Sequence, residues 1–193
     1  MGRYRGSVAG LTTSAEFSLR KPGSTDAAAI AEVHVTTWQA AYAGIFPDDF
    51  LSAMSVERRA DVWQRILDEA RDGPGLYVAD ADGGVIGFGH GGPSRDDDVG
   101  AAAEVYAVYI LPAWWGNGVG RALLDAVVGD LTAGGAPEAT LWVLEPNHRA
   151  RGFYEREGWK PDGRAVTIER GGATVRELRY RRPLLEHRRP VVT

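Results

Sequence analysis

The sequence predicts a single domain of the α/β class, because segments with helical periodicity and segments with strand periodicity alternate along it. Its 193 residues can build one substantial core but are too few for two average domains. Apolar side chains recur at helical spacing between residues 30 and 42, and strand-like runs occupy about 76–90 and 104–110. A glycine-rich turn and a second amphipathic helix directly follow the last of these strands.

The first elements are predicted to be a strand and two helices. Phe17–Arg20 alternates apolar and polar residues, and Ser24 or Thr25 is expected to cap the helix that follows. One continuous face of that helix carries Ile30, Val33, His34, Thr37, Trp38, Ala41 and Tyr42. Ser55 is expected to cap a second helix, whose inner face includes Trp63.

The middle of the chain changes to the period of strands. The turn Asp82-Gly83-Gly84 separates two apolar runs, 76–79 and 85–90, which predicts a hairpin. The segment Glu104–Ile110 is rich in valine and tyrosine and predicts a central strand. The helix after the glycine turn extends to about Leu131.

The C-terminal part adds a strand, a short helix and a final hairpin. Asn147 is expected to cap the short helix and Gly158 to end it. Gly171-Gly172 predicts the turn of the last hairpin. We therefore expect residues 1–15 to be a flexible extension, 16–183 the folded domain and 184–193 a tail, while 72–74 form part of a break between elements.

The composition argues against several classes of function. A formal charge of −4 gives no global positive field, so we expect no nucleic-acid partner, and the arginines between 179 and 189 are interpreted as a solvated strand end and tail. The absence of cysteine excludes disulfides and a cysteine nucleophile. The sequence shows neither the ~20 apolar residues of a membrane span nor a secretory signal, so we expect no membrane association and a cytoplasmic location.

Glycines 116, 118 and 120 stand between an apolar strand and an amphipathic helix, which is a position suited to bind an anion. Glycine lets backbone amides approach a ligand closely, and a helix N-terminus provides unpaired N–H donors and about half a positive charge. A pyrophosphate can bind at such a place without a lysine. The predicted ligand is therefore a pyrophosphate.

Three kinds of phosphate loop compete for this segment. A P-loop requires a Gly-Lys-Ser/Thr ending that the segment lacks. A dinucleotide fingerprint starting at Gly116 would need glycine where Arg121 stands, although Glu145 ends the next strand as that fold would require. The dinucleotide alternative, which implies an oxidoreductase, therefore stays open. The third pattern is [QR]-x-x-G-x-[GA].

With this third pattern, the segment Val108–Leu124 resembles the acetyl-CoA motif of the GNAT N-acetyltransferases, with Trp115 where the family usually has glutamine or arginine. The segment Glu145–Trp159 resembles the family's N-x-x-A-x-x-F-Y-E-x-x-G-[FW] segment. The resemblance covers about residues 17–181, and 76–160 carry most of its specificity. It implies the family's fold, a mixed and mostly antiparallel sheet with helices on both faces.

The resemblance also implies acetyl-CoA as cosubstrate and assigns residues to it. The pantetheine arm is expected to pair with the backbone of the central strand, and the diphosphate to bind amides of the glycine loop rather than the side chain of Trp115. The implied contacts are Val108, Tyr109, Ile110, Gly116, Asn117, Gly118, Val119, Gly120, Arg121, Asn147 and Tyr154. Asn147 can also act solely as a helix cap.

Two residues are candidates for the chemistry of transfer. Tyr154 matches the family's tyrosine near the cofactor sulfur, where a phenol can stabilise or protonate the leaving thiolate. Glu104 matches a glutamate that acts as base in some members, because an ammonium must lose a proton before it attacks. Each has a simpler interpretation, Tyr154 as a core residue and Glu104 as a solvated strand end, and a water chain is an alternative base.

The acceptor is expected to enter between the first helices and the central strands. Trp38 and Tyr42 are the candidate contacts, together with Asp48 and the loop that contains the run 96–98. This acidic run is either a solvated loop or an attraction for a cationic amine. His34, His90 and His148 lack the spacing of metal ligands, so no metal is expected.

These observations predict an acetyl-CoA-dependent N-acetyltransferase that acts on a primary amine of a small molecule. Direct attack by the amine requires no acyl-enzyme. A non-catalytic acyl-CoA sensor and a protein N-terminal acetyltransferase remain as alternatives. Pairing of terminal strands makes a homodimer an additional expectation.

Overall fold

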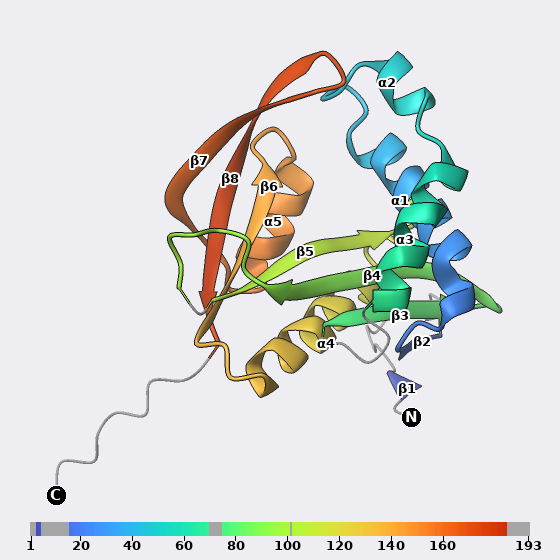
Figure 1. The fold of residues 1–193 in the computed structure, drawn as a ribbon, viewed down its shortest axis with the longest axis horizontal. Coiled ribbons are helices and arrows are strands. Elements are labelled where there is room, and N and C mark those ends of the chain that lie inside the picture. Colours follow the sequence, from blue (N-terminus) through green and yellow to red (C-terminus); the bar gives the residue numbers. More distant parts are fainter. Residues whose placement is uncertain (1–2, 5–15, 70–74, 101, 185–193) are drawn as a thin grey trace, which may run out of the picture.

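The computed structural model describes residues 3–4, 16–69, 75–100 and 102–184, and its strands form one mixed sheet (Figure 1). The strands are β1 (Arg3–Tyr4), β2 (Phe17–Arg20), β3 (Leu76–Ala81), β4 (Gly84–Pro93), β5 (Ala103–Ile110), β6 (Glu138–Leu144), β7 (Lys160–Arg170) and β8 (Ala173–Pro183). Their order is β1-β2-β3-β4-β5-β6-β8-β7, and only β5 and β6 run parallel. The expected mixed, mostly antiparallel sheet is confirmed.

Helices cover both faces of this sheet. They are α1 (Ala27–Ala41), α2 (Asp48–Ser52), α3 (Val56–Glu69), α4 (Val119–Ala133) and α5 (His148–Arg156), with short 3-10 turns η1 (Ser24–Asp26) and η2 (Pro112–Trp114). Residues of α1 and α3 pack with Val78 and Phe88 in one core, while α4 packs with Leu141 and Val143 in another. Figure 1 shows α1 and α3 on one side of β3 and β4 and α4 on the other.

Two boundary predictions were wrong. Neither Ser24 nor Thr25 caps α1, because both lie in the 3-10 turn η1 and Asp26 occupies the cap position. The carboxylate of Asp26 accepts a hydrogen bond from the backbone N–H of Gly23 (2.6 Å) and also binds Arg20. Residues 3–4 do not belong to a free extension, since they pair with β2, whereas the rest of 1–15, residues 72–74 and 185–193 lie outside the described residues.

The local signals for turns and caps are otherwise confirmed. Ser55 caps α3 by accepting a hydrogen bond from the backbone N–H of Arg58 (3.1 Å). The β3–β4 turn has positive φ at Asp82 and Gly83, as the favoured two-residue hairpin turn requires. Gly158 ends α5 with a φ of 84°.

Glycines in β4 allow α4 to lie close against the sheet. A Cβ atom at Gly89 would come within 2.9 Å of Val127, and one at Gly91 within 2.8 Å of the same side chain. Because alternate residues of a strand share a face, these glycines form a flat surface for the helix. The close packing sets the position of the N-terminal end of α4 beside the end of β5.

The sheet opens between β5 and β6. These strands pair only at Ala103 with Ala139 and Glu104 with Thr140, so the rest of β5 has no partner on that side among the described strands. Figure 1 shows β6, β8 and β7 diverging from the direction of β4 and β5. At the far end, the β7–β8 turn lies against α2, because a Cβ at Gly171 would overlap the ring of Phe50. No described helix is long and apolar enough to cross a membrane.

Candidate active site

The glycine loop leads from β5 into α4 through two residues of positive φ. Gly116 has a φ of 83° and Gly118 a φ of 82°, and nothing lies within 4 Å of the place where either Cβ would be. Gly118 is the N-cap of α4, and the first helical hydrogen bond runs from the N–H of Ala122 to its carbonyl (3.0 Å). The three N–H groups between them therefore have no partner within the helix, which leaves an open cradle for an anion.

A cavity of about 410 Å³ begins at this cradle and extends along β5 to α5. Nine residues expected to contact the cosubstrate line it: Val108, Tyr109, Ile110, Gly116, Gly118, Gly120, Arg121, Asn147 and Tyr154. Asn117 and Val119 do not line it, and the side chain of Val119 is fully buried in the core. Val119 can therefore contribute only its backbone N–H.

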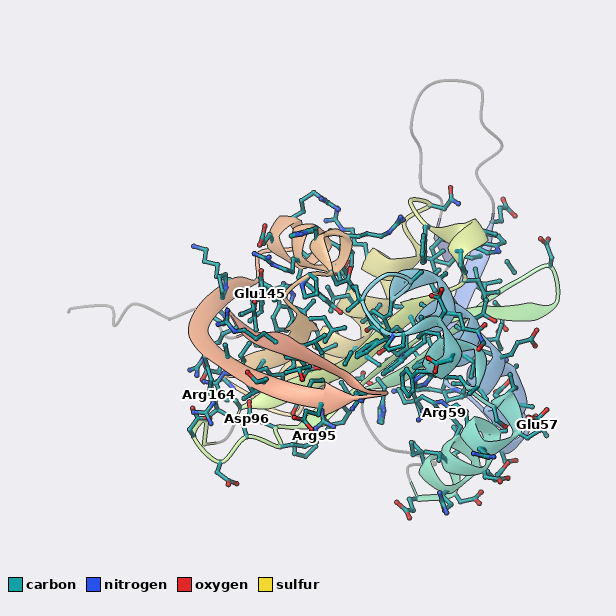
Figure 2. The ribbon with its side chains drawn as sticks, turned by 90° about the horizontal axis from the view of Figure 1, so that it is seen from above. Glu57, Arg59, Arg95, Asp96, Glu145 and Arg164 are labelled. Carbon is teal, nitrogen blue, oxygen red and sulfur yellow. The ribbon has the colours of Figure 1, made fainter. Side chains whose placement is uncertain are left out.

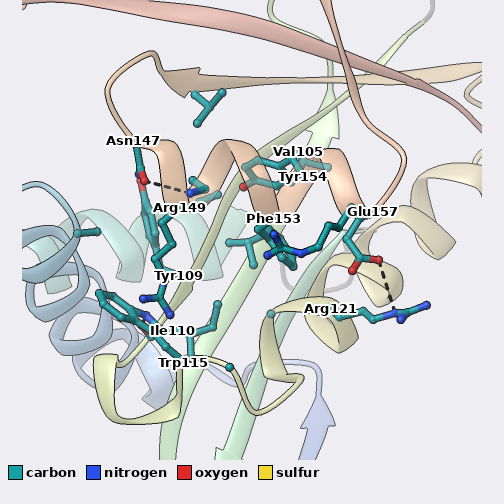
Figure 3. Close-up of a pocket in the computed structure, with 18 of the residues that line it drawn as sticks. Val105, Tyr109, Ile110, Trp115, Arg121, Asn147, Arg149, Phe153, Tyr154 and Glu157 are labelled. Atoms are coloured by element: carbon teal, nitrogen blue, oxygen red, sulfur yellow. Dashed lines mark hydrogen bonds and ion pairs between the residues drawn. The ribbon is translucent and has the colours of Figure 1, made fainter.

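The side chain of Trp115 contacts other residues of the protein and so supports the glycine loop. Its indole Nε1 donates a hydrogen bond to the carbonyl of Ile110 (2.8 Å), and the guanidinium of Arg149 lies 4.0 Å from the centre of its rings (Figure 3). The hydroxyl of Thr37 donates to the same carbonyl (3.1 Å). The Ile110 carbonyl thus already accepts two hydrogen bonds, and the expected pairing of the segment Val108–Ile110 with a pantetheine arm stays a prediction.

Asn147 caps α5, as its position predicted. Its side-chain oxygen accepts a hydrogen bond from the N–H of Ala150 (3.1 Å; Figure 3). The amide NH₂ has no partner among the described residues and the residue lines the cavity, so capping and ligand binding are compatible.

Tyr154 lies on the next turns of α5, beside Phe153 and Trp159. Its hydroxyl has no hydrogen-bond partner in the described part of the chain, and it faces the first cavity. Burial raises the pKa of this phenol above its ordinary value of 10. Tyr154 therefore keeps its proton at neutral pH and can donate a hydrogen bond to a thiolate.

A second cavity of about 1070 Å³ lies between the helices α1 and α3 and the β7–β8 hairpin. We call it the acceptor cavity and the first one the cofactor cavity. Trp38 and Tyr42 line it, as expected, whereas Asp48 lines neither cavity. The two cavities share the residues Tyr42, Tyr106, Ala107, Tyr109 and Trp142. They therefore meet on either side of β5.

Glu104 is 1% exposed and lines the acceptor cavity. The guanidinium of Arg95 donates to both of its carboxylate oxygens, and the backbone N–H of Arg95 donates to Oε2 (3.0 Å). The interpretation of Glu104 as a solvated strand end is therefore wrong. Its carboxylate is present at the acceptor cavity but is held by a cation.

The acidic loop after β4 is tied to β8. Arg179, which is only 4% exposed, binds Asp96 (3.1 Å), Asp98 (2.7 Å) and Asp162 (2.7 Å). Asp96 also accepts a hydrogen bond from the indole of Trp142 (3.1 Å). Arg179 is therefore not a solvated arginine, because a buried guanidinium without partners would be costly, whereas Asp98 remains an exposed loop carboxylate.

Two histidines contribute neutral rings to the acceptor cavity. Burial lowers the pKa of His34 to about 3 and that of His90 to about 4, and nearby arginines add to both effects. The indole of Trp63 donates to Nδ1 of His34 (3.3 Å), which fits a neutral imidazole. The described residues contain no group of histidines and carboxylates placed to hold a metal.

Several residues that line the two cavities were not predicted from the sequence. Arg149 lies within the segment Glu145–Trp159, and its place two residues after the cap Asn147 could have suggested that it lines the cofactor cavity. Figure 2 shows Arg95 and Asp96 beside the β7–β8 hairpin and Arg59 beside the helices. Arg59 lies on a predicted helix and Glu177 in an arginine-rich strand, and neither carried a sequence signal for a binding site.

The fold of this chain is shared with solved acetyltransferases. A PaiA N-acetyltransferase from Thermoplasma acidophilum, solved in complex with coenzyme A, superposes with a TM-score of 0.70 at 20% identity over 86% of this chain and 98% of its own. YncA from Salmonella typhimurium, solved with acetyl-CoA, gives a TM-score of 0.67 at 22% identity over 92% and 99%. The fold is therefore that of the GNAT class.

Sequence comparisons place the chain in a family. The model of the acetyltransferase (GNAT) family matches residues 35–159. The N-acetyltransferase YuaI of Bacillus subtilis is 34% identical over 67% of this chain and 73% of its own length. A mycothiol acetyltransferase of Propionibacterium freudenreichii is 34% identical over 66% of this chain but only 39% of its own. The chain belongs to the GNAT family, which confirms the predicted acetyl-CoA-dependent N-acetyltransferase.

Proposed function

We propose that this protein transfers the acetyl group of acetyl-CoA directly to a primary amine of a small molecule. The observation that carries this proposal is the meeting of the cofactor and acceptor cavities across β5. An amine in one cavity can reach a thioester in the other without a covalent enzyme intermediate. The mycothiol acetyltransferases match over about two fifths of their length or less, so their acceptor is not carried over.

Different residues of the cofactor cavity suit different parts of acetyl-CoA. The free N–H groups at the start of α4 suit the diphosphate, and the open space at Gly116 and Gly118 admits it. Arg149, held against Trp115, adds a cation beside the loop. The unpaired side of β5 suits a pantetheine arm through backbone hydrogen bonds, apart from the Ile110 carbonyl.

The chemistry requires proton movements at the nitrogen and at the sulfur. The acceptor ammonium loses one proton, its nitrogen attacks the acetyl carbon, and the C–S bond breaks as the C–N bond forms. The nitrogen then loses its second proton, and the departing sulfur gains one, so that the products are an amide and the free thiol of CoA. Tyr154 stabilises the departing thiolate by a hydrogen bond. Glu104 can take the first proton only when Arg95 leaves it, and a water chain is the alternative route.

An acceptor screen tests the proposed function. The enzyme is incubated with acetyl-CoA and a panel of amines, amino acids and peptides, and free thiol is monitored. Amine-dependent thiol release with a matching acetylated product is expected. Thermal stabilisation by acetyl-CoA without thiol release for any acceptor would instead support an acyl-CoA sensor.

The homodimer and the cytoplasmic location belong to the same proposal. β7 is an edge of the described sheet, and an edge strand can pair with a second copy. Size-exclusion chromatography with light scattering tests the dimer, and fractionation of cells that produce the protein tests the location.

A further inference from the structure

We propose that the acceptor is a primary amine with a single positive charge on an apolar body of aromatic size, and that its ammonium group binds Glu177. This inference rests on the proposed function, because it names the kind of amine used in that reaction. It begins with the three carboxylates that line the acceptor cavity, which are Asp96, Glu104 and Glu177.

Two of these carboxylates are occupied by groups of the protein itself. Asp96 binds the guanidinium of Arg179 and the indole of Trp142. Glu104 binds Arg95 through both oxygens. Neither carboxylate can receive a ligand without giving up contacts that offset its burial.

Glu177 is different, because it faces the cavity without a partner. It lies on β8, half-buried, between Leu144 of β6 and Val166 of β7 in the sheet. Within the described residues no group donates a hydrogen bond to its carboxylate and no cation forms an ion pair with it. Burial raises its pKa, and Arg170 and Arg95 counter this only from a longer range. A half-buried carboxylate of this kind is stabilised by a bound cation.

The position of Glu177 places such a cation near the reaction. Glu177, Tyr42 and Tyr109 line the same cavity, and the charge of Glu177 contributes to raising the pKa of both phenols. The two tyrosine hydroxyls are 3.5 Å apart, and both residues line the cofactor cavity as well. An ammonium group on Glu177 therefore lies beside the passage between the cavities.

The walls of the acceptor cavity select an apolar body for this ammonium. They include ten rings, which are those of His34, Trp38, Tyr42, Phe46, Phe50, Trp63, His90, Tyr106, Tyr109 and Trp142. The two histidines are neutral at pH 7, so they do not repel a cation. Aromatic faces attract a cation and bury an aromatic or aliphatic group, while hydroxyl groups of a sugar would lose their hydrogen bonds to water.

The arginines of the cavity restrict the acceptor to one charge. Arg59, Arg95 and Arg170 line it, and of these only Arg95 forms an ion pair with a carboxylate of the described residues. Arg170 lies 5.3 Å from the ring centre of Trp38. A second ammonium, as in a polyamine or an aminoglycoside, would meet a guanidinium rather than a free carboxylate. Like charges at such a distance disfavour binding.

Steady-state kinetics with two probe amines test the inference. Phenethylamine has one charge on an aromatic body, whereas spermidine has several charges on a flexible chain. We expect kcat/KM for phenethylamine to exceed that for spermidine by about 100-fold. Glu177→Gln should raise KM for phenethylamine by roughly 30-fold, as expected when a charge-assisted hydrogen bond is lost, and change kcat less than about threefold. Glu169→Gln, an exposed change on the same hairpin, should alter neither value.

Two further measurements separate this inference from the proposed function. Phenethylamine is titrated into the enzyme saturated with CoA, which cannot react, and tryptophan fluorescence or calorimetry reports binding. Thermal unfolding of Glu177→Gln should occur at the same or a higher temperature than that of the unchanged protein, because an unpaired half-buried charge is removed. If the role of the Glu177 carboxylate were purely structural, Glu177→Gln would unfold at a lower temperature than the unchanged protein.

The outcomes are distinguishable. Binding of phenethylamine that depends on Glu177, without thiol release from any amine, would support the acceptor class and overturn the acetyl transfer. Thiol release with spermidine at equal or higher kcat/KM, or identical kinetics of Glu177→Gln and Glu169→Gln, would overturn the acceptor class and leave the acetyl transfer standing.

Discussion

Arg95 covers the carboxylate of Glu104 with its guanidinium while the side chain of Arg95 itself remains 66% exposed. The pair stands at the edge of the acceptor cavity, and the guanidinium also lies 4.5 Å from the ring centre of Tyr106. A buried carboxylate is therefore protected by a cation that can move into solvent. The interaction has consequences for stability and for the availability of a base.

Replacing Arg95 by methionine should lower the free energy of unfolding by about 1–3 kcal/mol, because the buried carboxylate of Glu104 loses its side-chain donors. Urea unfolding at pH 7.5 measures the change. The double change Arg95→Met with Glu104→Leu should recover most of the loss, since no charge is then left unpaired. Arg58→Met, on the exposed side of α3, is the control. An equal loss of stability in Arg95→Met and Arg58→Met would contradict a specific role of Arg95 in pairing with Glu104.

Replacing Tyr154 by phenylalanine should lower kcat by about 100-fold and leave the affinity for CoA nearly unchanged. The phenol contributes a hydrogen bond to the thiolate that forms during transfer, and the ring remains in place. Thiol release under saturating acetyl-CoA measures kcat, and calorimetry measures CoA binding. Tyr77→Phe, which removes a hydroxyl bound to Asp130 away from both cavities, should retain full kcat. An unchanged kcat for Tyr154→Phe would remove the assigned role.

Replacing Gly118 by alanine should weaken CoA binding by roughly tenfold. A φ of 82° costs a residue with a Cβ about 1–2 kcal/mol, so the loop will shift and misplace the N–H donors of α4. Calorimetric titration with CoA measures the effect.

A matched control for Gly118 lies in the same helix. Gly129 has no atom within 4 Å of its would-be Cβ and lies within regular α4. Gly129→Ala should bind CoA normally and unfold at a slightly higher temperature, since alanine is favoured over glycine in a helix by about 1 kcal/mol. Equal CoA affinities of the two variants would argue against the amide cradle.

The stability of the fold should fall as the pH is lowered from 6.5 to 5. The folded-state pKa values of His34 and His90, about 3 and about 4, lie below the unfolded value of 6.5, so the unfolded state binds more protons in this range. Their contribution is complete above pH 6.5 and is lost as the pH falls toward the folded values, by up to about 1.4 kcal/mol per pH unit for each histidine. Urea unfolding across this range measures the slope.

Variants of the histidines identify the source of that slope. His34→Gln and His90→Gln should each flatten the dependence between pH 6.5 and 5, whatever their effect on stability at pH 7.5. His148→Gln, an exposed change at the start of α5, should leave the slope as it is. A slope that survives in the double variant His34→Gln with His90→Gln would assign it to other groups.

The cofactor side of the site could be predicted from the sequence because its signals are local. The glycine turn requires positive φ, a helix must begin after it, and Asn147 caps the helix that carries Tyr154. Each of these depends on neighbours within about four residues. The family motifs then supplied the expectation of acetyl-CoA, and the family comparison confirmed it.

The acceptor side could not be predicted in the same way, because its residues come from α1, α2, α3, β4, β5, β6 and both strands of the last hairpin. The sequence offers many arginines for each carboxylate, and the pairing of Arg179 with Asp96 spans 83 positions. Even at the start of α1, the cap residue Asp26 binds Arg20, which also binds the distant Asp80.

The sequence by itself determined the order of helices and strands, the glycine loop and the family, since periodicity, backbone freedom and capping act over short distances. Only the tertiary structure decided which carboxylates are free. Burial and ion pairing depend on segments that meet in space, and they leave Glu104 held by Arg95 while Glu177 faces the acceptor cavity without a partner among the described residues.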